Sequence, residues 1–152
     1  MTERLSYPRV SPGGMKALLG VKAYLDGCGL AAPLLDLVYL RVSQLNGCAY
    51  CIDLHTRDLL GHGMPVGKLA LIAVWEEAGE LFGAQERAAL AWSETVTLVA
   101  QTHVPDAAYA AAAAAFSGRE LADLTIAIGL MAAFNRLAIS FRSTPAAARN
   151  LS

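Results

Sequence analysis

Two cysteines and one histidine in a short stretch are the residues of this chain best suited to chemistry. Cys48 and Cys51 stand three residues apart, and His55 follows four residues after the second cysteine. On an α-helix, at about 100° and about 1.5 Å per residue, the three side chains fall within an arc of roughly 60°. The imidazole then lies about 6 Å along the axis from Cys51 and about 10 Å from Cys48. The spacing therefore predicts a dithiol on one helix face with a histidine beside it.

The acidity of the two thiols is predicted by two competing arguments. Thiolate is the reactive form of cysteine, and a neighbouring imidazole or a helix N-terminus lowers the thiol pKa. The helix dipole favours Cys48, which is nearer the N-terminus, whereas His55 lies closer to Cys51. We expect the histidine to decide, which makes Cys51 the more acidic and more reactive thiol. Two thiols one turn apart can also close a disulfide after modest side-chain adjustment.

Other uses of a C-x-x-C pair fit the surrounding residues less well. Haem attachment requires a histidine directly after the second cysteine, and that residue is Ile52. A structural zinc site requires four ligands, and Cys28 or Asp36 would have to approach the pair to complete one. A thioredoxin-like domain places the motif near a βαβ unit, but no strand-like alternation persists in this chain. Redox catalysis is therefore expected ahead of a metal site or inert packing.

The composition indicates one domain that associates with copies of itself. The chain has 152 residues, and we expect a single domain spanning 1–152, large enough to bury about two thirds of its unfolded surface. Only 16% of its residues are charged, against about 25% in an average globular protein. So few charges do not easily solvate a free surface, which favours a homo-oligomer. The net charge of −1 gives no electrostatic reason to expect nucleic acid or an anionic membrane as a partner.

The termini and cysteine count predict a cytoplasmic protein. The first residues contain no apolar signal-peptide core. Uninterrupted apolar runs fall short of the roughly 18 residues that a membrane span needs. Three cysteines are too few, and too unevenly placed, for a secreted disulfide scaffold. A reducing compartment, where a C-x-x-C pair is catalytic or metal-binding, fits better.

Helical periodicity accounts for most of the chain. The expected helices cover about 15–26, 33–45, 48–60, from 65 to 78, 84–100, from 103–106 to 117, and 119–141. Helix 33–45 is apolar nearly all round, and helix 119–141 is apolar on most faces, with Asn135 and Arg136 as polar exceptions. Helices of this kind are buried, and one small domain can enclose only one or two of them. The segment from Ser143 to Ser152 is expected to be loose.

Asp36 is a carboxylate on the most apolar of these helices. Burial should raise its pKa, so that it can hold or pass a proton near neutral pH. The alternative is a structural carboxylate satisfied by Ser43, Tyr39 or a backbone group. His62 shares the helix face of Cys48 but lies almost two turns beyond His55, which favours a C-terminal capping role over a catalytic one.

Taken together, these motifs resemble the AhpD-like branch of the carboxymuconolactone decarboxylase family. The resemblance is carried by Leu35-Asp36-Leu37, the run from Leu40 to Gly47, Cys48-Ala49-Tyr50-Cys51 with His55, Glu86 to Trp92, His103 to Asp106, and Asn135-Arg136-Leu137. It covers most of residues 33–141. It implies an all-α, AhpD-like bundle of about six to seven helices, assembled as a trimer or as a hexamer built from a trimer of dimers.

The resemblance also implies alkylhydroperoxidase-type thiol chemistry. Cys51 corresponds to the thiol that attacks peroxide, Cys48 to its resolving partner, and His55 to the histidine of the proton relay. The relay glutamate, twelve residues before the first cysteine, is replaced by Asp36, whose side chain is one methylene shorter. The implied partners are a hydroperoxide substrate and a dithiol or lipoyl-type reductant, with no metal, haem or flavin. The decarboxylase that names the family does not rely on a cysteine pair, so the pair favours the redox branch.

A second hypothesis belongs to another functional class. The chain would then be a redox-sensing or structural oligomer in which the Cys48–Cys51 pair changes assembly rather than turning over a substrate.

Overall fold

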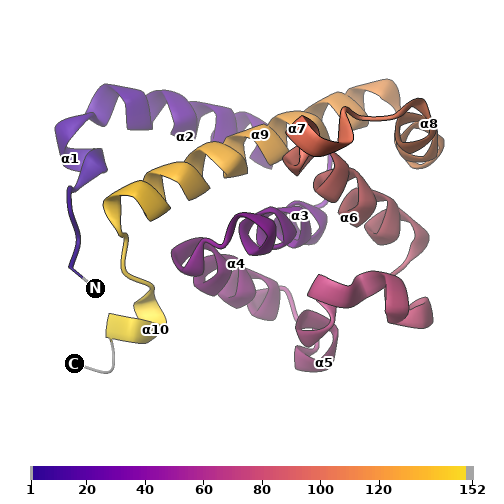
Figure 1. Cartoon of the computed structure of the whole chain (residues 1–152), viewed down its shortest axis with the longest axis horizontal. Coiled ribbons are helices and arrows are strands. Elements are labelled where there is room, and N and C mark those ends of the chain that lie inside the picture. The colour runs from indigo at the N-terminus through magenta and orange to yellow at the C-terminus, as the bar shows by residue number, and fades with distance from the viewer. Residues whose placement is uncertain (1, 150–152) are drawn as a thin grey trace.

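The computed structural model describes residues 2–149, and every regular element within that range is a helix (Figure 1). The α-helices are α1 (Tyr7–Val10), α2 (Pro12–Asp26), α3 (Ala32–Asn46), α4 (Ala49–Gly61), α5 (Val66–Ala70), α6 (Ala84–Thr97), α7 (Val99–Thr102), α8 (Asp106–Ala115), α9 (Gly118–Phe141) and α10 (Ala146–Arg149), with 3₁₀ helices η1 (Ile72–Glu77) and η2 (Gly79–Leu81). The expected all-α fold is confirmed.

Helix α3 lies at the centre of the molecule, where α4, α6 and α9 all pack against it. Figure 1 shows the long helix α9 running across the molecule, with α3 and α4 between it and α5. Eight residues of α3 are buried: Leu34, Leu35, Leu37, Val38, Tyr39, Leu40, Val42 and Ser43. The burial expected from the all-round apolar sequence is confirmed.

Helix α9 is the second main component of the core. The segment Gly118–Arg149 that contains it is long and apolar enough to cross a membrane by length and composition. The core helix of a globular protein passes the same test, and Leu124, Ala127, Ile128 and Met131 of α9 belong to the hydrophobic core. One such helix is therefore weak evidence for a membrane span.

The junction between α3 and α4 places the first cysteine of the motif. Gly47 ends α3 in the left-handed region, at φ 70° and ψ 33°, and the Cys48 amide donates to the Ser43 carbonyl at 2.9 Å. This pattern is a helix C-cap of the Schellman type. Cys48 then becomes the N-cap of α4, with its carbonyl accepting from the Ile52 amide at 2.9 Å. Cys48 thus immediately precedes α4, whereas the expected helix began at this residue.

The prediction of a single helix from 65 to 78 is wrong. Helix α5 ends at Ala70, and the 3₁₀ helix η1 follows, with Val74 at φ −128°. Tertiary hydrogen bonds explain the change: the Trp75 indole donates to Glu94 at 2.7 Å, and Arg87 donates to the Trp75 carbonyl at 3.4 Å. Both partners lie on α6, so they hold this segment in a course that a regular α-helix would not follow.

Two other boundaries also differ from expectation. The helix expected over 84–100 breaks at Leu98, which separates α6 from α7. The tail expected to be loose forms the short helix α10 within the described residues, because the Asp53 carboxylate accepts from the Ala146 amide at 2.9 Å and the Ala147 amide at 3.4 Å. Residues 150–152 lie outside the described range.

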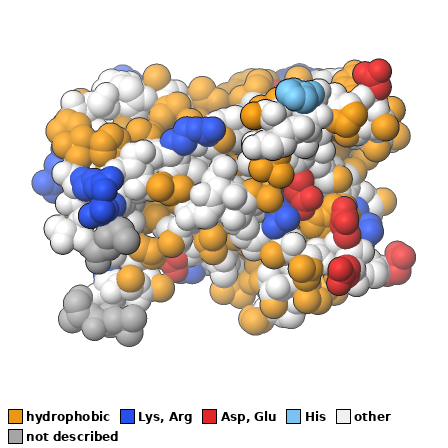
Figure 2. Space-filling model, viewed as in Figure 1, with side chains coloured by type: hydrophobic (Ala, Val, Ile, Leu, Met, Phe, Trp, Pro, Cys, Tyr) orange, Lys and Arg blue, Asp and Glu red, His pale blue; other side chains and the backbone are white. Residues whose placement is uncertain are grey.

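Several large apolar side chains remain exposed on the chain. Figure 2 shows apolar side chains spread over much of the visible face, with few charged groups between them. Leu19 and Tyr24 of α2 and Ile126 and Ile139 of α9 are about half exposed. Such surface is what a contact with another chain would cover. The homo-oligomer stays a prediction.

We predict that Gly47→Ala destabilises the protein by about 1–2 kcal/mol, because an L-residue is strained at this left-handed position although nothing crowds its Cβ. Gly20→Ala is the matched control, since Gly20 lies inside α2 with open space around it. That change should raise the free energy of unfolding by up to about 1 kcal/mol. Chemical denaturation of both variants measures the difference, and an unchanged or increased stability of Gly47→Ala would contradict the junction geometry.

Candidate active site

The structure brings the two cysteines of the motif into direct contact. Cys48 Sγ and Cys51 Sγ lie 2.6 Å apart, and both residues are free thiols. Both side chains are almost fully buried. The Cys51 amide also donates to Cys48 Sγ at 3.4 Å, which is the side-chain cap of α4. One sulfur therefore lies at a helix N-terminus, and the other lies nearly one turn further along the same helix.

The acidity of the pair is the reverse of the sequence-based expectation. Hydrogen bonding from the Cys51 thiol lowers the pKa of Cys48 to about 7, against the opposing effect of burial, and the Cys51 backbone amide adds to the lowering. The pKa of Cys51 is raised, first because its thiol donates to Cys48, then by burial and by the negative charge of Cys48. The prediction that Cys51 is the more acidic thiol is therefore wrong. The hydrogen bond between the sulfurs is the largest influence on the pKa of each thiol.

Buried amide and hydroxyl groups surround the dithiol. Asn135 of α9 donates to the Ser43 hydroxyl at 3.0 Å and accepts from the Asn46 amide at 3.0 Å. Hydrogen bonding from Asn135 also acts to lower the pKa of both thiols. Asn135, a polar exception on an apolar helix, thus satisfies polar groups of α3 in the core. Its proximity to the sulfur atoms was not foreseen, because it depends on how α9 packs on α3.

His55 is buried beside the motif but does not touch the sulfur atoms directly. Its side chain packs against the Tyr39 ring, with centroids 5.1 Å apart. His55 and Cys51 both line a cavity of about 250 Å³ between α2, α4 and α9. Seven apolar or aromatic residues and Ala138 make up most of that wall: Tyr7, Met15, Leu19, Tyr50, Leu54, Met131, Phe134 and Ala138. The thiol that faces open space is thus Cys51.

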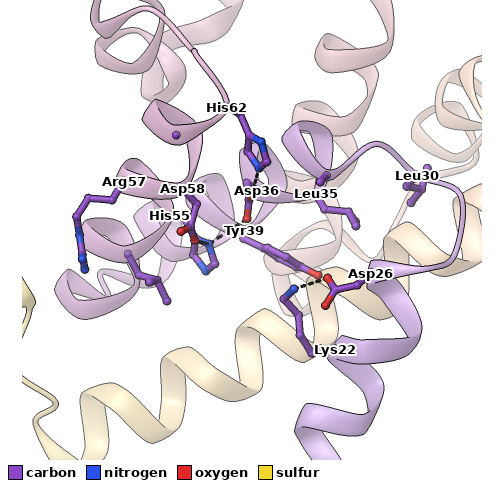
Figure 3. A pocket seen from close by; sticks show the side chains of 13 residues that line it. Lys22, Asp26, Leu30, Leu35, Asp36, Tyr39, His55, Arg57, Asp58 and His62 are labelled. Atoms are coloured by element: carbon purple, nitrogen blue, oxygen red, sulfur yellow. Dashed lines mark hydrogen bonds and ion pairs between the residues drawn. The ribbon is translucent and has the colours of Figure 1, made fainter.

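On its other side, His55 meets two carboxylates (Figure 3). His55 Nδ1 lies 3.4 Å from Asp36 Oδ1 and 3.3 Å from Asp58 Oδ2. The second oxygen of Asp36 lies 3.0 Å from His62 Nε2 and accepts a hydrogen bond from it in the tautomer that carries the proton on Nε2. Asp36 therefore reaches His55 despite its short side chain. Its strongest contact is with His62 rather than with Ser43, Tyr39 or the backbone.

These four side chains belong to a second, more open pocket of about 550 Å³. His55 lines both pockets, because its ring separates the thiol cavity from the carboxylates. His62 is the C-cap residue of α4, as expected, but its side chain also enters this pocket. Asp58 was overlooked in the sequence, although its place three residues after His55 puts it on the same helix face.

The sequence of this chain matches a known protein family. The model of the carboxymuconolactone decarboxylase family matches residues 12–95, which include all three cysteines. An uncharacterised protein of Bacillus subtilis (strain 168), YdfG, is 32% identical over 140 residues, covering 92% of this chain and 95% of that protein. The chain belongs to the carboxymuconolactone decarboxylase family.

Solved structures support the AhpD-like assignment within the carboxymuconolactone decarboxylase family. A protein of unknown function from Agrobacterium tumefaciens, proposed to be the antioxidant defence protein AhpD, superposes with a TM-score of 0.90 at 36% identity, covering 95% of this chain and 98% of that one. A peroxidase-related protein from Ralstonia eutropha JMP134, described as an alkylhydroperoxidase AhpD core, has a TM-score of 0.75 at 21% identity, with 91% and 73% covered, and shows the fold alone. The AhpD-like resemblance seen in the sequence is confirmed.

We predict that one thiolate forms near pH 7 in the reduced protein, and that it belongs to Cys48. Cys28→Ser serves as the background, because it removes the third thiol from the signal. Adding Cys51→Ser should keep a lowered pKa at Cys48, since the introduced hydroxyl and the backbone amide still donate to its sulfur. Adding Cys48→Ser should remove the step near pH 7, because Cys51 stays buried. Thiolate ultraviolet absorbance against pH measures both, and a step that survives only in the Cys48→Ser protein would contradict the assignment.

Proposed function

We propose that this protein is a thiol-dependent peroxidase of the AhpD type, which reduces hydroperoxides with the Cys48–Cys51 pair. The observation that carries the proposal is the placement of Cys51. Its sulfur faces the cavity that His55 also lines, and Cys48 Sγ stands 2.6 Å behind it. An attacking thiol, a resolving thiol and a proton-transfer group thus meet at one cavity, which is the arrangement that two-step thiol catalysis requires.

The cavity walls favour organic hydroperoxides. Aliphatic and aromatic side chains dominate the lining, and its polar groups besides Cys51 and His55 are Lys22 and the tyrosine hydroxyls. Burying an alkyl chain against such walls is favourable by about 0.8 kcal/mol for each methylene. A volume of about 250 Å³ accommodates a small alkyl or aryl group beside the peroxide. Hydrogen peroxide would gain none of this binding energy.

In the first step, Cys51 attacks the distal oxygen of the hydroperoxide. The proton on Cys51 moves across the sulfur–sulfur contact to Cys48, which leaves the negative charge on the sulfur that faces the substrate. The new S–O bond forms as the O–O bond breaks. The leaving alkoxide takes up a proton and departs as the alcohol, while Cys51 becomes a sulfenic acid. The role of Cys51 thus rests on access to substrate, not on its acidity.

In the second step, Cys48 attacks the Cys51 sulfur. Cys48 gives up the proton that it took in the first step, the S–S bond forms as the S–O bond breaks, and the hydroxide released takes that proton to become water. The low pKa of Cys48 favours this step, because the thiolate is the nucleophile in such exchanges. An external dithiol, such as a lipoyl group, then reduces the disulfide by two exchange reactions and is itself oxidised. One peroxide and one dithiol are consumed in each cycle.

His55 moves the protons that these steps require. Its ring faces Cys51 across the cavity on one side, and Asp36 and Asp58 on the other. Proton transfer to the leaving alkoxide therefore runs through His55, either directly or through one water in the cavity. Asp36 holds the orientation of the ring through its contact with Nδ1. The similar protein from Agrobacterium tumefaciens, proposed to be the antioxidant defence protein AhpD, supports a peroxidase-type function.

We predict that Cys51→Ser abolishes the consumption of an alkyl hydroperoxide in the presence of a lipoyl-type dithiol, because the attacking sulfur is lost. His55→Gln should slow turnover by about 10²–10⁴-fold, the range of a general acid–base group. Cys48→Ser should form the sulfenic acid once and then stop. Steady-state peroxide consumption and sulfenic-acid trapping measure these outcomes.

Cys28→Ser is the control for this experiment, since Cys28 lies outside the cavity and should be dispensable for turnover. Peroxide consumption that persists in Cys51→Ser would contradict the proposal. Absence of turnover in the wild type, together with a change of oligomer size on oxidation, would favour the redox-sensing alternative instead.

A further inference from the structure

A cluster of nitrogen and oxygen ligands lies on the side of His55 away from the thiols. His55 Nδ1, one oxygen of Asp36 and one oxygen of Asp58 all lie within 4.8 Å of one another. They come from the middle of α3 and from successive turns of α4. Figure 3 shows Asp36 and Asp58 beside the His55 ring, and His62 on the far side of Asp36. The proposed peroxidase chemistry does not need so many ligands at this point.

The buried nitrogen of His55 is the second observation. His55 is 5% exposed, and its Nδ1 makes no hydrogen bond to any residue of the described range 2–149. It nevertheless faces the oxygens of Asp36 and Asp58 at 3.4 and 3.3 Å. Buried polar atoms in folded proteins almost always have a partner. A buried ring nitrogen that makes no hydrogen bond and points between two carboxylates fits a metal-ligand set.

We propose that this cluster binds a divalent transition-metal cation of the zinc type, with His55, Asp36 and Asp58 as ligands. Bonds of about 2.0–2.1 Å to nitrogen and oxygen in a tetrahedral site separate neighbouring ligand atoms by about 3.3–3.4 Å. The distances from His55 Nδ1 to the two carboxylates match that separation without any movement of the ring. The distance between the carboxylates closes by a turn of Asp58, whose side chain is 41% exposed. Imidazole with carboxylates suits zinc and its neighbours in the first transition row.

His62 is the fourth ligand. Its Nε2 already lies 3.0 Å from Asp36 Oδ2, and its side chain is 36% exposed, so the ring can turn toward the cation. The two cationic side chains of the same pocket are engaged elsewhere: Lys22 pairs with Asp26, and Arg57 pairs with Asp53 at 3.0 Å. The negative charge of the cluster is therefore left for a metal ion.

The open pocket of about 550 Å³ gives a cation access to these ligands from solvent. A bound cation and the proposed proton relay would compete for the same atom, His55 Nδ1. This consequence rests on the proposed function, whereas the binding itself does not. No metal was expected from the sequence, because these ligands do not form a local metal-binding motif. The cluster arises from residues that helix packing brings together.

Metal binding to protein without free motif thiols tests the proposal. We use the Cys48→Ser/Cys51→Ser variant, with folding checked by circular dichroism, and wild-type protein with the disulfide closed as a second form. Zinc binding by calorimetry should show one site per chain, and cobalt should give a spectrum of nitrogen and oxygen ligation without a thiolate charge-transfer band. Asp58→Asn should weaken zinc binding by at least about tenfold. Loss of a residue that only hydrogen-bonds to a ligand already costs that much, and loss of a ligand should cost no less.

Asp26→Asn is the matched control, because it removes the same charge from the same pocket without removing a ligand. Its affinity should stay within about twofold of the parent. Binding only when the thiols are free, or equal weakening by Asp26→Asn and Asp58→Asn, would overturn the site. The metal experiment uses no peroxide, so the two proposals can fail separately. Absence of zinc binding would not contradict the proposed peroxidase function, and absence of peroxidase turnover would not contradict the metal site.

Discussion

The contact between Cys48 and Cys51 is the interaction on which the rest of the site depends. At 2.6 Å, one thiol donates to the other, so the pair holds its negative charge on the sulfur at the helix N-terminus. That geometry requires the chain to turn between α3 and α4, which Gly47 does in its left-handed conformation. It also requires a polar wall in a hydrophobic core, which Ser43 and Asn135 supply. Acidity and substrate access therefore belong to different sulfurs. Cys48 has the lower thiol pKa, and Cys51 faces the cavity.

His55 connects this buried pair to solvent. One side of its ring faces an apolar cavity suited to the organic part of a peroxide, and the other side faces Asp36 and Asp58 in an open pocket. A proton can therefore move between the dithiol and water without opening the core. The same placement makes Nδ1 of His55 available to a cation from the solvent side. The proposed peroxide chemistry and the proposed metal site thus use opposite sides of one buried side chain.

The sequence predicted the helices better than the chemistry inside them. An all-round apolar pattern is enough to place helix 33–45 in the core, and cysteine spacing is enough to bring the thiols together. Acidity was predicted in the wrong order because distances along an ideal helix ignore the hydrogen bond between the two sulfurs. Helical spacing was enough to predict that Asp58 lies beside His55. The approach of Asn135 to the dithiol depends on the packing of α9, which no local sequence pattern encodes.

Formation of the Cys48–Cys51 disulfide tests the central claim most directly. That claim is that the two cysteines form one two-electron redox centre. Reduced protein treated with one equivalent of an alkyl hydroperoxide, then alkylated and digested without reductant, is analysed by mass spectrometry. The account predicts that the peptide containing both cysteines loses two hydrogens, while Cys28 is recovered as the alkylated thiol. Oxidation recovered at Cys28, or a sulfinic acid at one motif cysteine with the other still alkylated, would contradict it.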